Sequence, residues 1–216
     1  MIFNLSEQPS IGNQFLKELR DKEIQKDRWR FRVNLERLGE ILAYELSKQL
    51  TYESKQVETP LGMATVEVPA HRIVLATILR AGLPMHAGML RMFDHADNAF
   101  ISAYRIEHKS GSLEINVEYV SSPNLEGATL ILCDPMLATG ASMDLVIQAL
   151  IETGNPSEIH AVSAIACRTG LEFVSRQHPR VNFWVGAIDE ELTAKSYIVP
   201  GMGDAGDLSF GLKEPE

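Results

Sequence analysis

Apolar positions along the chain follow two different spacings. Early in the chain they recur at steps of three and four residues, the pattern of an amphipathic helix; these positions are Leu35, Leu38, Ile41, Leu42 and Leu46. From residue 73 onward, short continuous apolar runs alternate with segments of helical pattern. The runs predict buried strands over residues 73–79, 99–104, 129–133, 159–166 and 182–188, and the other segments predict helices over residues 84–93, 141–153 and 169–177. Apolar strands separated by helices are typical of a parallel sheet covered on both faces, the doubly wound α/β class.

Three segments depart from this alternation. Residues 110–120 alternate polar and apolar side chains, which favours an exposed antiparallel hairpin, and we assign a flap to residues 104–121. Residues 1–50 are rich in charge and helical in pattern, so we expect a helical N-terminal arm. Thr59-Pro60-Leu61-Gly62 predicts a turn. With 216 residues the chain has the length of a single domain, residues 1–216.

Charge and composition narrow the class of protein. The chain has 20 basic and 29 acidic residues, a formal net charge of −9. This argues against general binding to a nucleic-acid backbone but allows a small anionic ligand in a locally positive pocket. No apolar run approaches the ~20 residues of a membrane span, and the first thirty residues lack the apolar stretch of a secretion signal, so we expect a cytoplasmic protein. Cys133 and Cys167 lie in apolar runs and are expected to be buried free thiols.

The segment from residue 129 to residue 142 carries the strongest chemical signal. An apolar strand ends in an acid, Asp134, and a short loop of small residues leads directly into a helix. Ligands of open α/β sheets bind at the carboxyl ends of strands, and a helix N-terminus there attracts phosphate. Thr139 and Ser142 add hydroxyl donors, and Gly140 allows the backbone to approach a ligand closely. Because Asp134 would repel a phosphate, its expected partners are sugar hydroxyls or a cation held by the ligand.

A literal G-x-G-x-x-G pattern occurs near the C-terminus, at residues 201–206. A dinucleotide-binding fingerprint needs this pattern between a strand and a long helix, within a βαβ unit. Here Pro200 precedes it, Asp207 follows it and only ten residues remain after Gly206, so that unit has no room. We therefore reject a nicotinamide-dependent oxidoreductase. The Walker phosphate-binding sequence is also absent.

Residues 134–142 resemble the phosphoribosyl diphosphate (PRPP) loop of the type I phosphoribosyltransferases, and their D-P-M-L-A-T-G form resembles that of the uracil phosphoribosyltransferases. Three other blocks resemble signature segments of the same family, in the family's order: residues 78–83, Tyr104-Arg105 and residues 197–207. The similarity covers the chain from about residue 30 to the C-terminus. It implies a type I phosphoribosyltransferase fold, in which a twisted parallel sheet flanked by helices carries an antiparallel flap and a C-terminal hood, residues 189–216, that binds the base.

The resemblance implies an enzyme that transfers ribose 5-phosphate from PRPP to N1 of uracil, giving UMP and diphosphate. It also implies that Asp134 hydrogen-bonds the ribose hydroxyls and that backbone N–H groups of residues 138–142 hold the 5-phosphate. Arg80 and Arg105 would address the diphosphate, because arginine is always charged and donates two parallel hydrogen bonds. The implied PRPP-binding residues are Arg80, Arg105, Asp134, Pro135, Met136, Leu137, Ala138, Thr139, Gly140, Ala141, Ser142 and Asp204.

The hood carries the implied base recognition. The resemblance implies uracil contacts at Ile198, Gly203, Asp204 and Ala205. A backbone segment can match the alternating acceptors and donor of uracil, whereas cytosine would leave buried groups unpaired.

Catalysis is implied for Asp204 and Arg105. Asp204 would either stabilise a ribosyl cation-like transition state or orient the N1 proton of uracil. We expect Asp207 to satisfy N–H groups of its own loop, as aspartates in turns often do.

Cofactor and partner expectations follow from the same resemblance. Mg²⁺ is expected to arrive with PRPP and not to be bound directly, since the six histidines lack paired ligand spacing. GTP is an implied effector and a homo-oligomer, dimer or larger, is the implied assembly; no nucleic acid or membrane partner is expected. A second hypothesis is an RNA-binding regulator of pyrimidine genes with the same fold. Its basic face would be residues 17–37, where basic and acidic residues are interleaved.

Overall fold

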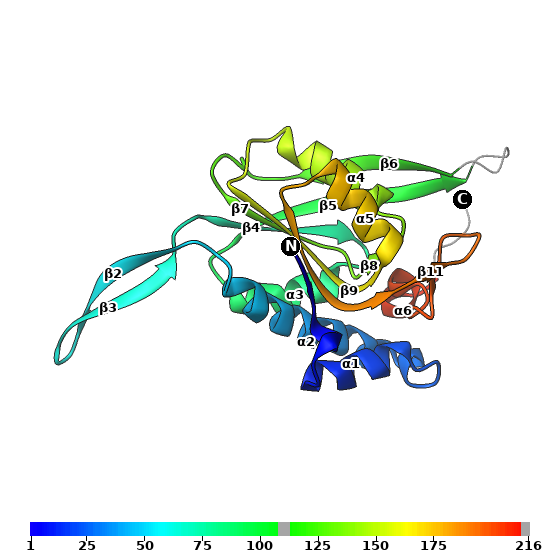
Figure 1. Ribbon diagram of the computed structural model, residues 1–216, viewed down its shortest axis with the longest axis horizontal. Coiled ribbons are helices and arrows are strands. Elements are labelled where there is room, and N and C mark those ends of the chain that lie inside the picture. The colour runs from blue at the N-terminus through cyan, green and yellow to red at the C-terminus, as the bar shows by residue number, and fades with distance from the viewer. Residues whose placement is uncertain (108–112, 213–216) are drawn as a thin grey trace.

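The computed structural model describes residues 1–107 and 113–212, with side chains described outside residues 104–117. Its main sheet has the strand order β1-β10-β9-β7-β4-β5-β6 (Figure 1). These strands are β1 (Ile2–Asn4), β4 (Ile73–Leu79), β5 (Asp97–Glu107), β6 (Leu113–Ser121), β7 (Thr129–Cys133), β9 (Glu158–Cys167) and β10 (Val181–Asp189), and the short β8 (Met136–Leu137) pairs with β9. The neighbours pair in parallel except β5 and β6. The expected α/β class is confirmed.

The five predicted strands are confirmed, and β4 and β7 have the predicted bounds. Every side chain of β7 and the five central side chains of β4 are buried. Both strands lie in the middle of the sheet with helices on each face, and such strands must be apolar on both sides. β5 runs past its predicted end and pairs antiparallel with β6, which gives the predicted hairpin. The turn residues 108–112 of the flap lie outside the described residues.

Helices cover both faces of the sheet (Figure 1). α4 (Ala141–Ile151) and α5 (Arg168–Gln177) lie on one face, and the other face carries α1 (Ile11–Arg20), α2 (Arg28–Ser47) and α3 (Leu83–Met92). Two separate apolar clusters result. One contains Leu35 of α2 and Met85 of α3, and the other contains Val146 of α4 and Leu171 of α5. The sheet therefore has a buried layer of side chains on each side.

The N-terminal helices are part of the core. The predicted apolar face of α2 is confirmed, because four of its leucines are fully buried and Ile41 packs against them. Asp27 begins the helix by accepting hydrogen bonds from the backbone N–H groups of Trp29 and Arg30. Short 3₁₀ turns, η1 (Leu5–Glu7) and η2 (Ile24–Lys26), flank α1. Residues 11–47 thus close one face of the sheet.

A two-stranded hairpin, β2 (Tyr52–Thr59) and β3 (Gly62–Pro69), projects from the body of the molecule (Figure 1). The predicted turn joins its strands, and Leu61 at the tip is 99% exposed. Only this turn is predicted from the sequence, because β2 is almost entirely polar and carries no pattern of a half-buried strand.

The C-terminal hood folds over the carboxyl edge of the sheet. After β10 the chain forms the antiparallel pair β11 (Glu191–Leu192) and β12 (Ile198–Val199), followed by the short helix α6 (Ala205–Phe210). α6 packs against α2. Elements this short cannot bury a core of their own, so their position depends on contacts with the body of the protein. Within the described chain, no helix combines the length and the apolar character needed to cross a membrane.

Candidate active site

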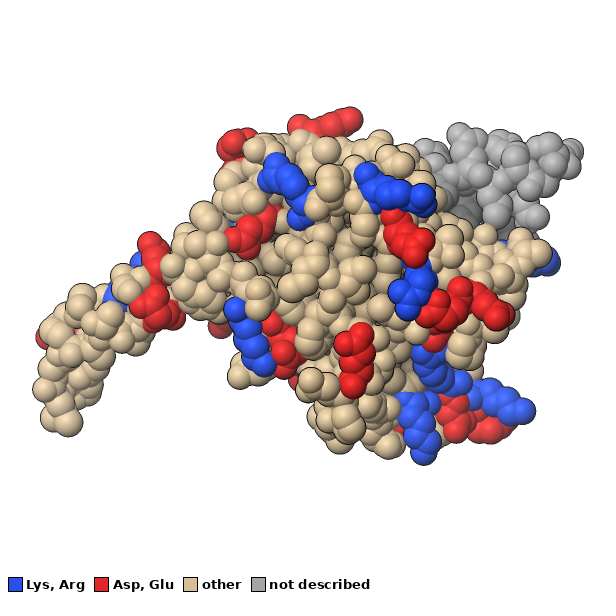
Figure 2. Space-filling view, in the orientation of Figure 1, with Lys and Arg blue, Asp and Glu red and all other residues tan. Residues whose placement is uncertain are grey.

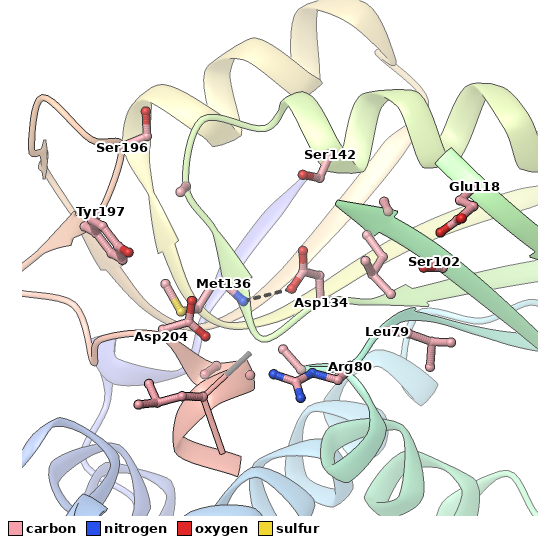
Figure 3. A pocket seen from close by; sticks show the side chains of 17 residues that line it. Leu79, Arg80, Ser102, Glu118, Asp134, Met136, Ser142, Ser196, Tyr197 and Asp204 are labelled. Atoms are coloured by element: carbon pink, nitrogen blue, oxygen red, sulfur yellow. Dashed lines mark hydrogen bonds between the residues drawn. The ribbon is translucent and has the colours of Figure 1, made fainter. Parts of the chain in front are cut away.

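A cleft of about 970 Å³ opens at the carboxyl edge of the sheet (Figure 3). β4, β5 and β7 are parallel neighbours, so their carboxyl ends lie side by side. Asp134 follows β7, Arg80 follows β4, Asp204 comes from the hood, and all three line the cleft. Segments far apart in the sequence therefore share one cavity, at the edge where open α/β sheets bind ligands.

Hydrogen bonds to β9 hold the loop after β7. The backbone N–H of Asp134 donates to the Val162 carbonyl at 3.0 Å, and the Ile165 N–H donates to the Pro135 carbonyl at 3.0 Å. Asp134 Oδ1 accepts the N–H of Met136 at 3.3 Å. These bonds fix the direction in which the Asp134 carboxylate leaves the strand.

The same loop ends at Gly140, the N-cap of α4. Its φ is 86°, and a Cβ there would lie 2.7 Å from Val174 Cγ2 and 2.9 Å from the Gly170 carbonyl oxygen. Glycine satisfies both the left-handed conformation and the lack of space. Without a side chain Gly140 cannot cap the helix, and Thr139 Oγ1 accepts the Ala141 N–H at a long 3.4 Å. This positive end of α4 suits an anionic group.

The Arg80 guanidinium enters the cleft from the loop after β4, and the Leu79–Arg80 peptide bond is cis. Its Nη2 donates to Asp207 Oδ1 at 3.3 Å and to the Gly211 carbonyl at 3.1 Å. Its Nε is buried and has no hydrogen-bond partner among the described residues. A buried donor without a partner costs free energy. An anion bound in the cleft would supply the missing acceptor.

Asp204 is the N-cap of α6 and points into the cleft (Figure 3). Its Oδ1 accepts the backbone N–H of Asp207 at 2.9 Å, which fixes the carboxylate. The carboxylate of Asp207 instead forms an ion pair with Arg80. The expectation that Asp207 satisfies its own loop is therefore wrong. Asp204 takes that role because the residue directly before a helix is the one whose side chain reaches the first free N–H groups.

Some of the residues that the family resemblance implies for substrate binding line the cleft. The implied residues that line it are Arg80, Asp134, Met136, Ala138, Ser142, Asp204 and Ala205. The other implied residues outside the flap are not among those that line the cleft: Pro135, Leu137, Thr139, Gly140, Ala141, Ile198 and Gly203. Arg105 lies in β5, paired with Ile115 of β6, and its side chain is outside the described residues.

Four further polar residues line the cleft without being implied by the sequence: Ser102, Glu118, Ser196 and Tyr197. Ser102 lies beside Leu79 in the parallel pairing of β5 with β4. Glu118 reaches the cleft through the antiparallel pairing of β6 with β5, which no local pattern reports. Tyr197 opens the hood block noted above, so its position was available as a signal. Ser196, directly before Tyr197, has a φ of 61°, a conformation that residues other than glycine adopt uncommonly.

Carboxylates outnumber cations on the described wall of the cleft. Glu118, Asp134 and Asp204 line it together with Arg80. Among the residues that the structure describes, no group of three or more His, Cys, Asp or Glu side chains is placed to hold a metal ion. A polyanionic ligand at this wall would need further positive charge.

The predicted free and buried state of both cysteines is confirmed. Cys133, the last residue of β7, lies directly before Asp134. Burial raises the pKa of its thiol to about 12, so the thiol is neutral at physiological pH. A neutral thiol is a poor nucleophile, and Cys133 has a packing role.

Comparison with known proteins agrees with this geometry. The family model "Uracil phosphoribosyltransferase" matches residues 7–211. A uracil phosphoribosyltransferase of Porphyromonas gingivalis is 48% identical over 98% of this chain and 99% of its own, and one of Pyrococcus furiosus is 35% identical over 97% and 90%. A solved structure of a protein from Aquifex aeolicus, 31% identical, superposes with a TM-score of 0.88 and covers 98% of this chain and 99% of its own. The chain, with its type I phosphoribosyltransferase fold, belongs to the uracil phosphoribosyltransferase family.

Proposed function

We propose that the protein transfers ribose 5-phosphate from PRPP to N1 of uracil. The bond from the anomeric carbon to the diphosphate oxygen breaks, the diphosphate keeps the electron pair, and the bond from N1 to the anomeric carbon forms as the N1 proton leaves. The products are UMP and diphosphate. The family match over residues 7–211 supports this reaction. The structural observation that carries it is the single cleft shared by the Asp134 loop and the hood.

PRPP would lie along the Asp134 loop. The Asp134 carboxylate would accept hydrogen bonds from the ribose hydroxyls, and the backbone at the start of α4 would hold the 5-phosphate, where Ser142 adds a hydroxyl. Arg80, whose Nε has no acceptor among the described residues, would bind the diphosphate. Arg105 is assigned to the same group by family resemblance.

Uracil would lie between the hood and the ribose site. Backbone groups near Gly203 and Ala205 follow the turn into α6 and would face the edge of the base, and Ala205 lines the cleft. The Asp204 carboxylate, fixed by its cap, would place negative charge near the anomeric carbon, where positive charge develops in the transition state. Ile198 would support this segment from β12.

Mg²⁺ would enter as the PRPP complex. The described wall carries three carboxylates and one arginine, so a free diphosphate would be repelled. A divalent ion on the diphosphate removes that repulsion and prefers phosphate oxygens together with water. We expect PRPP binding, measured by calorimetry, to weaken strongly in excess chelator and to recover when Mg²⁺ is added back; equal binding with and without Mg²⁺ would contradict the proposal.

UMP formation is the direct test of the reaction. The protein is mixed with PRPP, Mg²⁺ and one base at a time, and UMP is expected with uracil. Failure with uracil combined with turnover of orotate or a purine would overturn the assignment.

Asp134→Asn tests the ribose contact, and it should raise the KM for PRPP because a charged acceptor is lost. Asp94, an exposed acid after α3, is the matched control, and Asp94→Asn should leave this KM unchanged. Equal KM values in both variants would remove Asp134 from the PRPP site.

We also propose that the protein forms a homo-oligomer through its β2–β3 hairpin. An isolated two-stranded hairpin is marginally stable in water, and this one exposes Val57, Leu61 and Met63. A second copy of the chain would cover these side chains. Light scattering should give at least twice the chain mass, and deletion of residues 54–67 should lower it to the monomer mass; an intact protein of monomer mass would refute this.

GTP as an activating effector is proposed on family resemblance alone. The test is the rate of UMP formation with and without GTP, and unchanged kinetics over the whole range of GTP concentrations would reject it.

An RNA-binding regulator finds no support. In the basic segment considered for RNA, Arg20 pairs with Asp189, Arg30 pairs with Glu18 and Lys26 pairs with Glu23. Figure 2 shows blue and red side chains interspersed over the visible face, without a continuous basic patch. Paired cations release few counterions to a nucleic acid.

A further inference from the structure

One residue of the hood, Gly201, is held at both its backbone N–H and its carbonyl by the ion pair between Arg20 and Asp189. The N–H of Gly201 donates to Asp189 Oδ2 at 2.9 Å, and the Gly201 carbonyl accepts a hydrogen bond from Arg20 Nη1 at 3.0 Å. Arg20 also donates to both oxygens of Asp189, from Nη1 and Nη2 at 2.8 Å each. The three residues form a closed ring of hydrogen bonds, which we call the Gly201 clamp.

The clamp joins three separate parts of the fold. Asp189 is the last residue of β10, where the hood begins, and Gly201 is twelve residues further on. Their hydrogen bond joins the two ends of the segment that contains β11 and β12. Arg20 is the last residue of α1, where a cation is favoured by the helix dipole. The side chain of Asp189 is only 7% exposed, and Arg20 provides the opposite charge that a buried carboxylate requires.

The backbone conformation at Gly201 suits the clamp and favours glycine. Its φ is 58°, and a Cβ there would lie 3.0 Å from the carbonyl carbon of Ile198. The next carbonyl, that of Met202, accepts a hydrogen bond at 2.7 Å from Gln25 when the Gln25 amide is oriented to satisfy its neighbours. Two successive peptide units therefore face the N-terminal helices, and the cleft-lining residues Asp204 and Ala205 follow directly.

We propose that Arg20 and Asp189 are positioning residues for base recognition, a role that rests on the proposed function. Neither residue lines the cleft. By fixing the peptide at Gly201 they set where the backbone groups of residues 203–205 meet the base. A displacement of about 1 Å in a substrate-positioning segment can cost about 10²-fold in activity. The PRPP loop is tied to β9 by its own hydrogen bonds, so loss of the clamp should affect uracil and spare PRPP.

The test is a separation of the two KM values. Arg20→Met should raise the KM for uracil about ten- to a hundredfold and change the KM for PRPP less than about twofold. Arg20→Lys keeps the charge but loses the planar fork, so its KM for uracil should lie between those of the parent and Arg20→Met. Asp189→Asn should behave like Arg20→Met. PRPP binding by calorimetry and the melting temperature are measured on each variant.

An adjacent ion pair supplies the matched control. Glu190 follows Asp189 in the sequence, and its two carboxylate oxygens accept hydrogen bonds from Arg168 at 2.7 and 2.8 Å. Unlike Arg20, Arg168 donates to no backbone carbonyl of the hood residues that the structure describes. Arg168→Met should leave both KM values unchanged. If Arg20→Met fails to fold, Arg20→Lys and Asp189→Asn decide the question by the same criterion.

The inference and the proposed function fail in different ways. An active parent whose clamp variants keep the uracil KM within twofold overturns the inference alone. So does an equal rise of both KM values, since that is the mark of a general structural defect. A parent protein that forms no UMP overturns the proposed function and the clamp together.

Discussion

Replacing Gly140 by alanine tests whether the start of α4 depends on the absence of a side chain. The φ of 86° is left-handed, and an alanine in such a conformation costs about 1–2 kcal/mol. The added Cβ would also lie 2.7 Å from Val174 Cγ2 and 3.0 Å from Phe173 Cδ1, whereas carbon atoms normally pack at about 3.5–4.0 Å. Such overpacking adds about 1–3 kcal/mol. We therefore expect Gly140→Ala to lower the free energy of unfolding by about 2–5 kcal/mol.

Gly127 offers a matched control. Its φ is 66°, but apart from its own chain neighbours no atom of the described residues lies within 4 Å of the position that a Cβ would take. Gly127→Ala should therefore cost only the conformational strain, about 1–2 kcal/mol. At about 2–4 °C per kcal/mol for a chain of this size, the expected losses in melting temperature are about 2–8 °C for Gly127→Ala and about 4–20 °C for Gly140→Ala. Gly127 precedes the amino end of β7, opposite the cleft, so only Gly140→Ala should also raise the KM for PRPP.

The assays are thermal unfolding of both variants and steady-state kinetics with PRPP as the varied substrate. The steric reasoning predicts an ordering: parent, then Gly127→Ala, then Gly140→Ala. Equal melting temperatures for the two variants would refute the steric contribution of Val174 and Phe173. An unchanged KM for PRPP in a destabilised Gly140→Ala would separate the packing role of the glycine from the phosphate site.

Three further predictions follow from single side chains. Asp204→Asn should keep PRPP binding and the α6 cap, since asparagine caps as well as aspartate, but lose most turnover; unchanged kcat would remove the Asp204 charge from the mechanism. Hydrogen bonds from Asn34 and Gln14 lower the pKa of Glu18 from 4.5 to about 2, so Glu18 stabilises the fold above pH 4.5 and loses this contribution as the pH falls toward 2. Glu18→Gln should be less stable at pH 7 by about 1–2 kcal/mol and match the parent near pH 2 in urea unfolding; a gap that stays constant with pH would argue against this linkage. Burial raises the pKa of Cys133 to about 12, so a disulfide reagent at pH 8 should label the thiol only after denaturation, and rapid labelling of the native protein would show that the site opens.

Sequence patterns predict the helices and strands whose burial shows in their own sequence. β4 and β7 are buried on both faces, so their uninterrupted apolar runs mark their bounds directly. The β2–β3 hairpin has no such signature, because its side chains are exposed on both faces. β1 is not predicted for a related reason, because a strand of three residues is too short to show a period.

The two halves of the cleft differ in the same way. The half of the cleft around Asp134 is one continuous strand, loop and helix, so the local sequence is enough to place Asp134 and Gly140. Glu118 reaches the cleft only through the pairing of β6 with β5. Asp204 caps α6 because the helix begins at Ala205, and Asp207 pairs with Arg80, which lies 127 residues earlier in the chain. Local turn chemistry cannot report such a partner.

The hood has no core of its own, and this gives the N-terminal helices a second role. α6 has six residues and β11 and β12 have two each, so these elements depend on contacts with the body of the protein to stay folded. Three side chains from residues 20–32 donate hydrogen bonds to backbone carbonyls of the hood. Arg20 donates to Gly201, Gln25 to Met202, and Arg32 to Ser209 at 2.7 Å. Composition alone presents this charged segment as a solvated surface. In the folded protein two of its arginines, Arg20 and Arg32, instead donate hydrogen bonds to backbone carbonyls of the hood, so part of the charge in this segment holds the C-terminal elements in place.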